Sequence, residues 1–149
     1  MLNMVDRMSH SVNVRDIPAF LHRLMLELAG KAHISLEGDL SRCQLSDGIV
    51  VTREETAILK RNTIAPVQDF VVLRLAPETV PTIFKQAMAA GLNRAIIHVQ
   101  IERNGVLELA AYDNFDPECV VTGPSISPAL LSELKNTNVL GEFRDTTSR

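Results

Sequence analysis

Three stretches of the chain repeat apolar residues at the spacing of a helix with one buried side. The clearest covers residues 16–30, where Pro18 occupies the first turn and Gly30 marks the end. A second covers residues 79–90 and is followed by Gly91, a residue that tolerates the left-handed conformation found at helix ends. A third, shorter stretch begins at Ser127 and Pro128 and ends at residues 136–138. The pattern therefore predicts three helices.

Strand-like patterns fill the intervals between these helices. Residues 34–37, 40–45, 49–52 and 56–61 form short β-rich runs that are separated by turn residues. Residues 69–75 are apolar on both alternations, which is typical of an interior strand with something covering each side. Because this strand precedes a helix and another strand, it favours a right-handed crossover, with parallel pairing if the two strands are neighbours.

The strongest local signal is a hairpin over residues 95–112, with Gly105 at its turn. A two-residue Asn-Gly turn pairs Ile101 with Glu108 and so mixes polar and apolar side chains on each face. A three-residue loop with Gly105 in a bulge position instead pairs Ile101 with Leu107 and sorts the faces cleanly. We therefore expect the three-residue loop. After the hairpin, residues 113–117 predict a turn-rich corner, and residues 118–121 resume as a strand.

Together these elements predict one α+β domain over residues 1–149. We expect a mixed or mainly antiparallel sheet, with the first two helices on one face and the last helix at an edge. A chain of 149 residues that is 46% hydrophobic can bury a core without disulfides or metals. Residues 1–12 and 142–149 are expected to be flexible ends, and no repeat or linker indicates a second domain.

Charge and composition exclude several classes of partner. The net charge is −3, and the 15 Lys and Arg residues are scattered along the chain, so we expect no nucleic acid and no membrane surface as a partner. The longest apolar stretches are broken by charges, and the N-terminus lacks the apolar run of a secretory signal. The two cysteines form no CxxC pair. These features predict a cytoplasmic, reducing location.

The densest polar cluster lies between Tyr112 and Cys119. Asp113 is a candidate catalytic base and Cys119 a candidate nucleophile, with His98 from the preceding strand as a further member. A structural interpretation is favoured, because Asp and Asn suit a corner and Cys119 stands beside two valines. A small enzyme with its site at this corner remains the alternative function. No histidine or cysteine pair has ligand spacing and no nucleotide motif occurs, so we predict neither metal nor cofactor.

The leading hypothesis is a binding surface on the face of the sheet away from the helices. Phe70 and Val72, from the strand over residues 69–75, would lie on this face if that strand is near the hairpin. Leaving both exposed would lose a few kcal/mol of hydrophobic stabilisation at about 25 cal/mol per Å². Three covers are open for these side chains: the meander that the β-rich runs over residues 34–61 would form, a second subunit or a ligand. We therefore predict a non-catalytic binding protein that uses this face and self-associates as a homodimer, with a protein or small molecule as a further candidate partner. The candidate binding residues are Phe70, Val72, His98, Gln100, Glu108 and Tyr112.

Residues 33–40, 59–63, 69–73 and 111–119 are similar to segments of small bacterial proteins carried on mobile gene cassettes. The similarity extends over residues 16–140. That group has no established activity, so the resemblance implies a stand-alone bacterial cytoplasmic protein and assigns no site residue.

Overall fold

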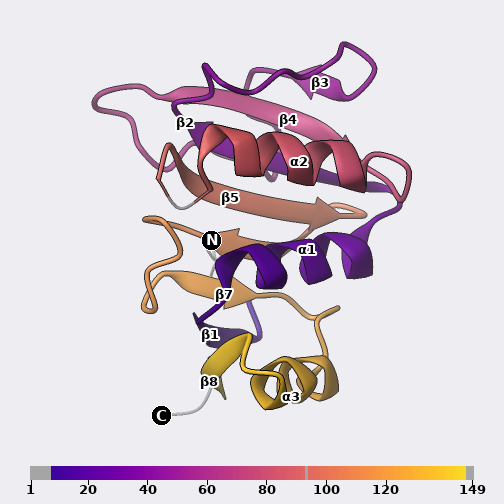
Figure 1. Ribbon diagram of the computed structural model, residues 1–149, viewed down its shortest axis with the longest axis vertical. Helices are drawn as coiled ribbons and strands as arrows, with labels where there is room; N and C mark the ends of the chain where they lie inside the picture. The colour runs from indigo at the N-terminus through magenta and orange to yellow at the C-terminus, as the bar shows by residue number, and fades with distance from the viewer. Residues whose placement is uncertain (1–7, 93, 147–149) are drawn as a thin grey trace.

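Eight antiparallel strands and three helices form the protein within the residues that the computed structural model describes, 8–92 and 94–146 (Figure 1). The strand order across the sheet is β3-β4-β2-β5-β6-β7-β1-β8. The α+β architecture with a single sheet is therefore confirmed. The elements, in chain order, are β1 (His10–Val14), α1 (Ile17–Leu28), β2 (Ala32–Gly38), β3 (Val50–Thr52), β4 (Asp69–Leu75), α2 (Val80–Ala90), β5 (Ile96–Arg103), β6 (Val106–Ala111), β7 (Val120–Thr122), α3 (Pro128–Asn136) and β8 (Leu140–Asp145).

The helices lie on one face of the sheet, with α1 and α2 side by side and α3 beside the edge strand β8 (Figure 1). Helix α1 begins where the sequence predicts, because the side chain of Asp16 accepts a hydrogen bond from the N–H of Ala19 and Pro18 sits in the first turn. Its apolar stripe is fully buried against alternate residues of the strands. This packing forms the main core and leaves the opposite face of the sheet, here called the second face, to be covered by other means. Among the described residues, no helix combines the length and apolar character needed to cross a membrane.

The hairpin forms at the predicted place but in a different register. Its turn is the two-residue Asn104-Gly105 turn, in which both residues have positive φ angles of 53° and 78°. Ile101 pairs with Leu109, and the register shifts between Ile101 and the next residue, so that Glu108 is the extra residue of a β-bulge. The predicted three-residue loop is therefore wrong. A two-residue turn without a bulge would pair Ile101 with Glu108. The bulge shifts the register by one residue, so that Ile101 pairs with Leu109 and apolar side chains face each other.

Other elements also differ from the prediction. Strand β2 lies between β4 and β5 and is antiparallel to both, so the strands that flank α2 are not neighbours. Residues 40–45 and 56–61 form no strand. Residues 10–12 and 142–145, expected in flexible ends, belong to β1 and β8, which pair with each other. Residues 1–7 and 147–149 of those predicted ends lie outside the described residues.

Candidate functional site

Residues 53–68, the connection from β3 to β4, cross the second face of the sheet and are here called the cover segment. Leu59 is fully buried and packs in one cluster with Phe70 and Val72. The N–H of Lys60 donates to Oε1 of Gln100 at 3.0 Å, which ties the segment to the middle of the sheet. The chain therefore covers this part of its own sheet.

This cover changes the expectation for Phe70 and Val72. Their exposed fractions are 3% and 0%. Of the three covers considered for these two side chains, the early part of the chain is the one in place. A second subunit or a ligand is therefore not needed to cover Phe70 and Val72.

Side chain–backbone hydrogen bonds fix the cover segment, which contains neither helix nor named strand. Thr56 Oγ1 accepts from the N–H of Leu59 at 2.9 Å, and Glu55 accepts from the N–H of Arg61 at 2.8 Å. The guanidinium of Arg61 lies over the ring of Phe70, with its central carbon 5.0 Å from the ring centroid. These local contacts give the segment one defined path across the sheet.

Glu37 anchors the cover segment from β2. Its side chain accepts hydrogen bonds from the N–H groups of Asn62 at 2.8 Å and Thr63 at 3.2 Å, although the residue is only 1% exposed. A buried carboxylate is costly unless donors satisfy it, and here two backbone donors do so. Glu37 therefore acts as a fixed acceptor for the segment that covers it.

His98 stands opposite Glu37 on β5 and has both ring nitrogens occupied. The N–H of Asp113 donates to Nδ1 at 3.1 Å, so in the neutral ring Nε2 carries the hydrogen and donates to Thr63 Oγ1 at 2.7 Å. The ring also meets that of Tyr112 edge-on, with 5.6 Å between centroids. His98 links the corner to the cover segment and is 3% exposed, which leaves no free nitrogen for a substrate.

Gln100 and Tyr112 complete this polar network. Gln100 Nε2 donates to Tyr112 Oη at 2.7 Å, while Oε1 accepts from Ser35 Oγ at 3.3 Å. Burial raises the pKa of Tyr112 and the negative charge of Glu37 adds to the increase, while the hydrogen bond from Gln100 opposes it. The structure thus brings together three of the predicted binding residues, His98, Gln100 and Tyr112. His98 and Gln100 are buried, not presented to a partner.

Glu108 lies apart from that network. As the extra residue of the bulge it is 2% exposed, and its carboxylate accepts hydrogen bonds from both the N–H and the hydroxyl of Ser125. A Cβ at Gly123 would stand 2.5 Å from Oε1 of Glu108, so only glycine fits beside the bulge. The expectation that Glu108 belongs to an open recognition face is therefore wrong, because it holds the β6–β7 region to the following loop.

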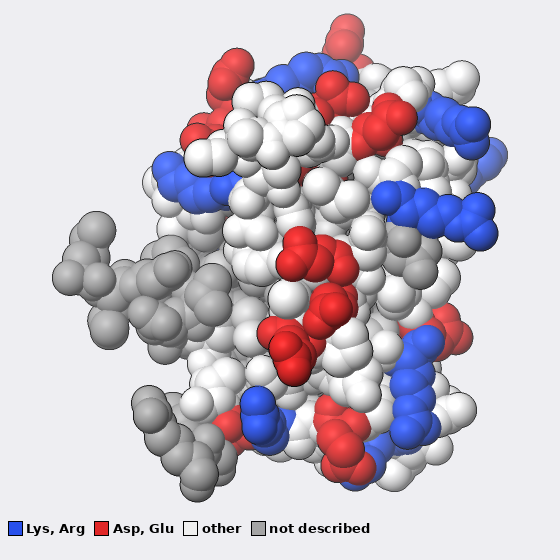
Figure 2. All heavy atoms as spheres, turned by 90° about the vertical axis from the view of Figure 1, so that its left-hand side faces the viewer, with Lys and Arg blue, Asp and Glu red and all other residues white. Residues whose placement is uncertain are grey.

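The corner that carries the catalytic candidates is exposed and acidic. It lies at the side of the molecule that Figure 2 presents, where acidic side chains gather in the middle of the view. The Cys119 thiol lies 3.7 Å from a carboxylate oxygen of Asp113. Partial burial raises the pKa of Cys119, and the negative charges of Asp113, Asp116 and Glu118 raise it further. The thiol therefore stays protonated at neutral pH, the opposite of an activated nucleophile.

An apolar pocket of about 240 Å³ opens between the cover segment and the sheet. At its wall, Nδ1 of His33 meets Oε1 of Glu102 at 2.5 Å, and Oε2 of Glu102 accepts from the N–H of Gly105 at 2.9 Å. Val72 is the one predicted binding residue in the pocket. The apolar lining residues are Val51, Ala57, Ile58, Leu59 and Val72.

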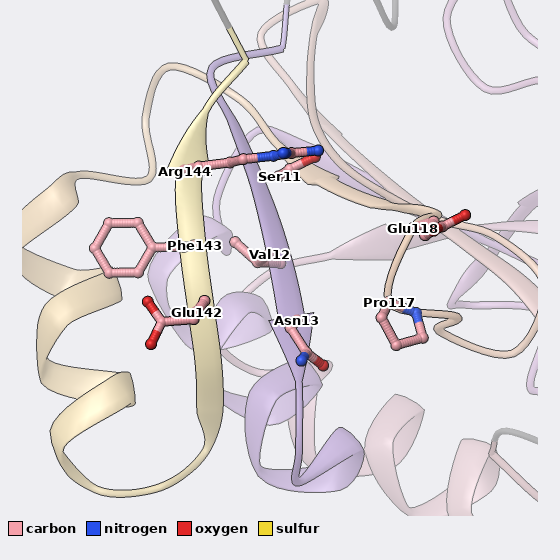
Figure 3. Close-up of a pocket in the computed structure, with 8 residues that line it drawn as sticks. All are labelled: Ser11, Val12, Asn13, Pro117, Glu118, Glu142, Phe143 and Arg144. Atoms are coloured by element: carbon pink, nitrogen blue, oxygen red, sulfur yellow. The ribbon is translucent and has the colours of Figure 1, made fainter. Parts of the chain in front are cut away.

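A second hollow lies at the opposite end of the second face (Figure 3). This groove, of about 580 Å³, runs between β1, β8 and the acidic corner. Its lining mixes polar and apolar surface, and the polar side chains are Ser11 and Asn13 from β1, Glu118 from the corner, and Glu142 and Arg144 from β8. Within residues 8–92 and 94–146, no segment covers this groove, and none of the polar side chains that line it is buried.

Sequence reasoning missed the acceptor Glu37, the His33–Glu102 pair and the contribution of Leu59. The available signal was the alternation in β2, where polar residues at 33, 35 and 37 interrupt an otherwise buried strand.

Within residues 8–92 and 94–146, no group of three His, Cys, Asp or Glu side chains could hold a metal ion. Comparison of the chain with protein-family models, with curated proteins and with solved structures found no match.

Proposed function

We propose that the protein is a non-catalytic binding protein that holds a small, largely apolar molecule in the 240 Å³ pocket on the second face of its sheet. The observation that carries this proposal is the pocket itself. Its walls are apolar side chains of the cover segment and of strands β3 and β4, with a single His–Glu pair among them. Cavities of about 150 Å³ accept a benzene-sized molecule, so this volume suits one ring with a short substituent.

The polar groups at the pocket wall suit the orientation of a bound molecule. Both oxygens of Glu102 already accept hydrogen bonds, from His33 and from Gly105. A carboxylate that is held in this way fixes the orientation of the neighbouring imidazole. His33 is a half-exposed polar group beside the apolar walls, and one such group is enough to select the orientation of a ligand.

Benzyl alcohol, with toluene as the analogue that lacks a hydroxyl, tests the proposal by protein-observed NMR titration. We expect saturable shifts confined to amides of residues 51–59 and of the strands behind them. Val51→Glu places a charge at the pocket wall and should weaken binding about tenfold or more, because the carboxylate must be desolvated when the ligand enters.

Val106→Glu is the matched control. Val51 and Val106 are exposed strand valines, 52% and 41% exposed, but Val106 lies outside the pocket. The control variant should bind as the unmodified protein does. The proposal would be overturned if neither benzyl alcohol nor toluene binds saturably, or if Val51→Glu and Val106→Glu weaken binding equally.

A further inference from the structure

Strand β8 is the last strand at one edge of the sheet within the described residues. The N–H of Thr146 donates to the carbonyl of Ser9 at 2.9 Å, which fixes the phase of the β1–β8 ladder. Because successive residues of an antiparallel strand direct their backbone groups to opposite sides, the N–H and C=O of Phe143 point away from β1. Such an edge is a template for another strand.

The sequence of this edge is complementary to itself. Phe143 stands between an acidic and a basic residue, Glu142 and Arg144. If two copies of β8 pair in antiparallel orientation about a two-fold axis at Phe143, each Glu142 faces Arg144 of the partner subunit. Phe143, whose backbone points outward, then forms the hydrogen-bonded pair, so the two ion pairs occupy the neighbouring positions where side chains approach most closely.

We propose that two copies of the chain associate through β8 in this register and so join their sheets edge to edge. Charge complementarity argues for a second copy as the occupant, because the same short segment supplies both halves of each ion pair. The inference is independent of the ligand pocket, which lies under the cover segment at the other end of the sheet order.

The side chains of Glu142 and Arg144 are exposed at this edge. The Glu142 side chain is 83% exposed and bonds to Lys135 Nζ at 3.0 Å, a contact that leaves its other oxygen for a second cation. Figure 3 shows Glu142 and Phe143 on the side of β8 away from β1, and Arg144 extended over Ser11. Arg144 is exposed, so a change of rotamer brings its guanidinium to the outer edge.

The contact is short, which sets the expected strength. The register between β1 and β8 shifts between Val12 and Val14, where residues 141 and 142 stand opposite Asn13 alone. This bulge twists the first half of β8 and leaves residues 142–145 as the regular part. A short edge contact stabilised by two ion pairs should give a reversible dimer that forms with increasing concentration and weakens in high salt.

Charge reversal tests both the partner and the register. Arg144→Glu and Glu142→Arg each create two like-charge contacts per dimer and should each raise the dimer dissociation constant about tenfold or more in sedimentation experiments. An equimolar mixture of the two variants should form a heterodimer, because every cross-strand pair in it is then opposite in charge. Lys85→Glu, an exposed reversal on α2, is the control for net charge and should leave dimerisation unchanged.

A measurement on the unmodified chain checks the same contact without any substitution. The amide of Phe143 should exchange with solvent more slowly as protein concentration rises, while the amide of Val51 at the opposite edge strand should not change. A monomer at every concentration would overturn the proposal, as would a dimer that the reversals do not weaken. Failure of the mixed variants to associate, with each variant folded, would overturn the register.

Discussion

The two halves of the second face differ in what covers them. In the covered half, β2, β4 and β5 lie beneath the cover segment, and Glu37, His98 and Gln100 are no more than 4% exposed. In the open half, β1 and β8 carry Asn13 and Arg144, which are exposed beside a groove of about 580 Å³. Both halves place polar side chains on the same face of one sheet. Polar character alone therefore does not decide whether a strand face meets water or protein.

Hydrogen-bond demand explains the difference. The cover segment has no strand partner for its N–H groups at residues 60, 62 and 63, and the side chains of Gln100 and Glu37 accept from them. The polar residues of the covered half thus replace the water that a solvated face would use. In the part of the chain that the structure describes, the open half has no comparable backbone to satisfy, so Asn13 and Arg144 remain exposed.

Truncation of Leu59, which packs the cover segment onto the sheet, should have the largest effect on stability and should separate the two halves most clearly. Leu59→Ala deletes a fully buried side chain and should lower the free energy of unfolding by about 3 kcal/mol. Arg144→Ala, in the open half, should change it by no more than about 0.5 kcal/mol. Urea denaturation of dilute samples measures both. Similar losses for the two variants would mean that the cover segment contributes little to the fold.

Regular elements were predictable because their signals are local. The sequence predicts a helix over residues 79–90, and α2 spans Val80–Ala90. The hairpin register was not predictable from residues 95–112 alone, because it depends on how residues outside the hairpin hold Glu108. That side chain is held by Ser125 and fits only beside Gly123, a glycine 15 residues further along the chain. A bulge that a distant loop stabilises leaves no trace in the alternation of the two strands.

Part of the polar network on the second face was predictable in membership but not in environment, whereas Val72 is the only residue of the proposed pocket that the sequence predicted. The alternation of β5 correctly places His98 and Gln100 on one face, and Tyr112 does lie within reach of both. Their burial depends on the cover segment, which lacks apolar periodicity. That segment is fixed by bonds from Thr56 to its own backbone and from Glu37 across 25 residues of chain. Contacts of this kind depend on tertiary arrangement, which a single sequence does not display.

Substitution of Tyr112 should have an intermediate effect on stability, and that effect should depend on pH. Tyr112→Phe removes the hydrogen bond from Gln100 and should cost about 1 kcal/mol at neutral pH. Burial raises the pKa of Tyr112, so the folded state holds the phenolic proton more tightly than the unfolded chain, whose value is about 10. This stabilisation is complete below that value and is lost as the pH rises through the folded-state pKa. Between neutral pH and pH above 10, the unmodified protein should therefore lose more stability than Tyr112→Phe. Parallel curves of unfolding free energy against pH would contradict the buried environment of the phenol.

Cys119 provides the smallest effect on stability and the test of the alternative enzyme. Cys119→Ala should change the free energy of unfolding by no more than about 0.5 kcal/mol, because the thiol is half-buried and makes one weak contact.

In a Cys43→Ala background, iodoacetamide at neutral pH should alkylate Cys119 more slowly than it alkylates an unstructured cysteine peptide. The reason is that a raised pKa leaves less thiolate. Asp113→Asn and Glu118→Gln each remove a negative charge and should speed the reaction about twofold to threefold. A thiol that reacts faster than the peptide would instead favour nucleophilic chemistry at the corner.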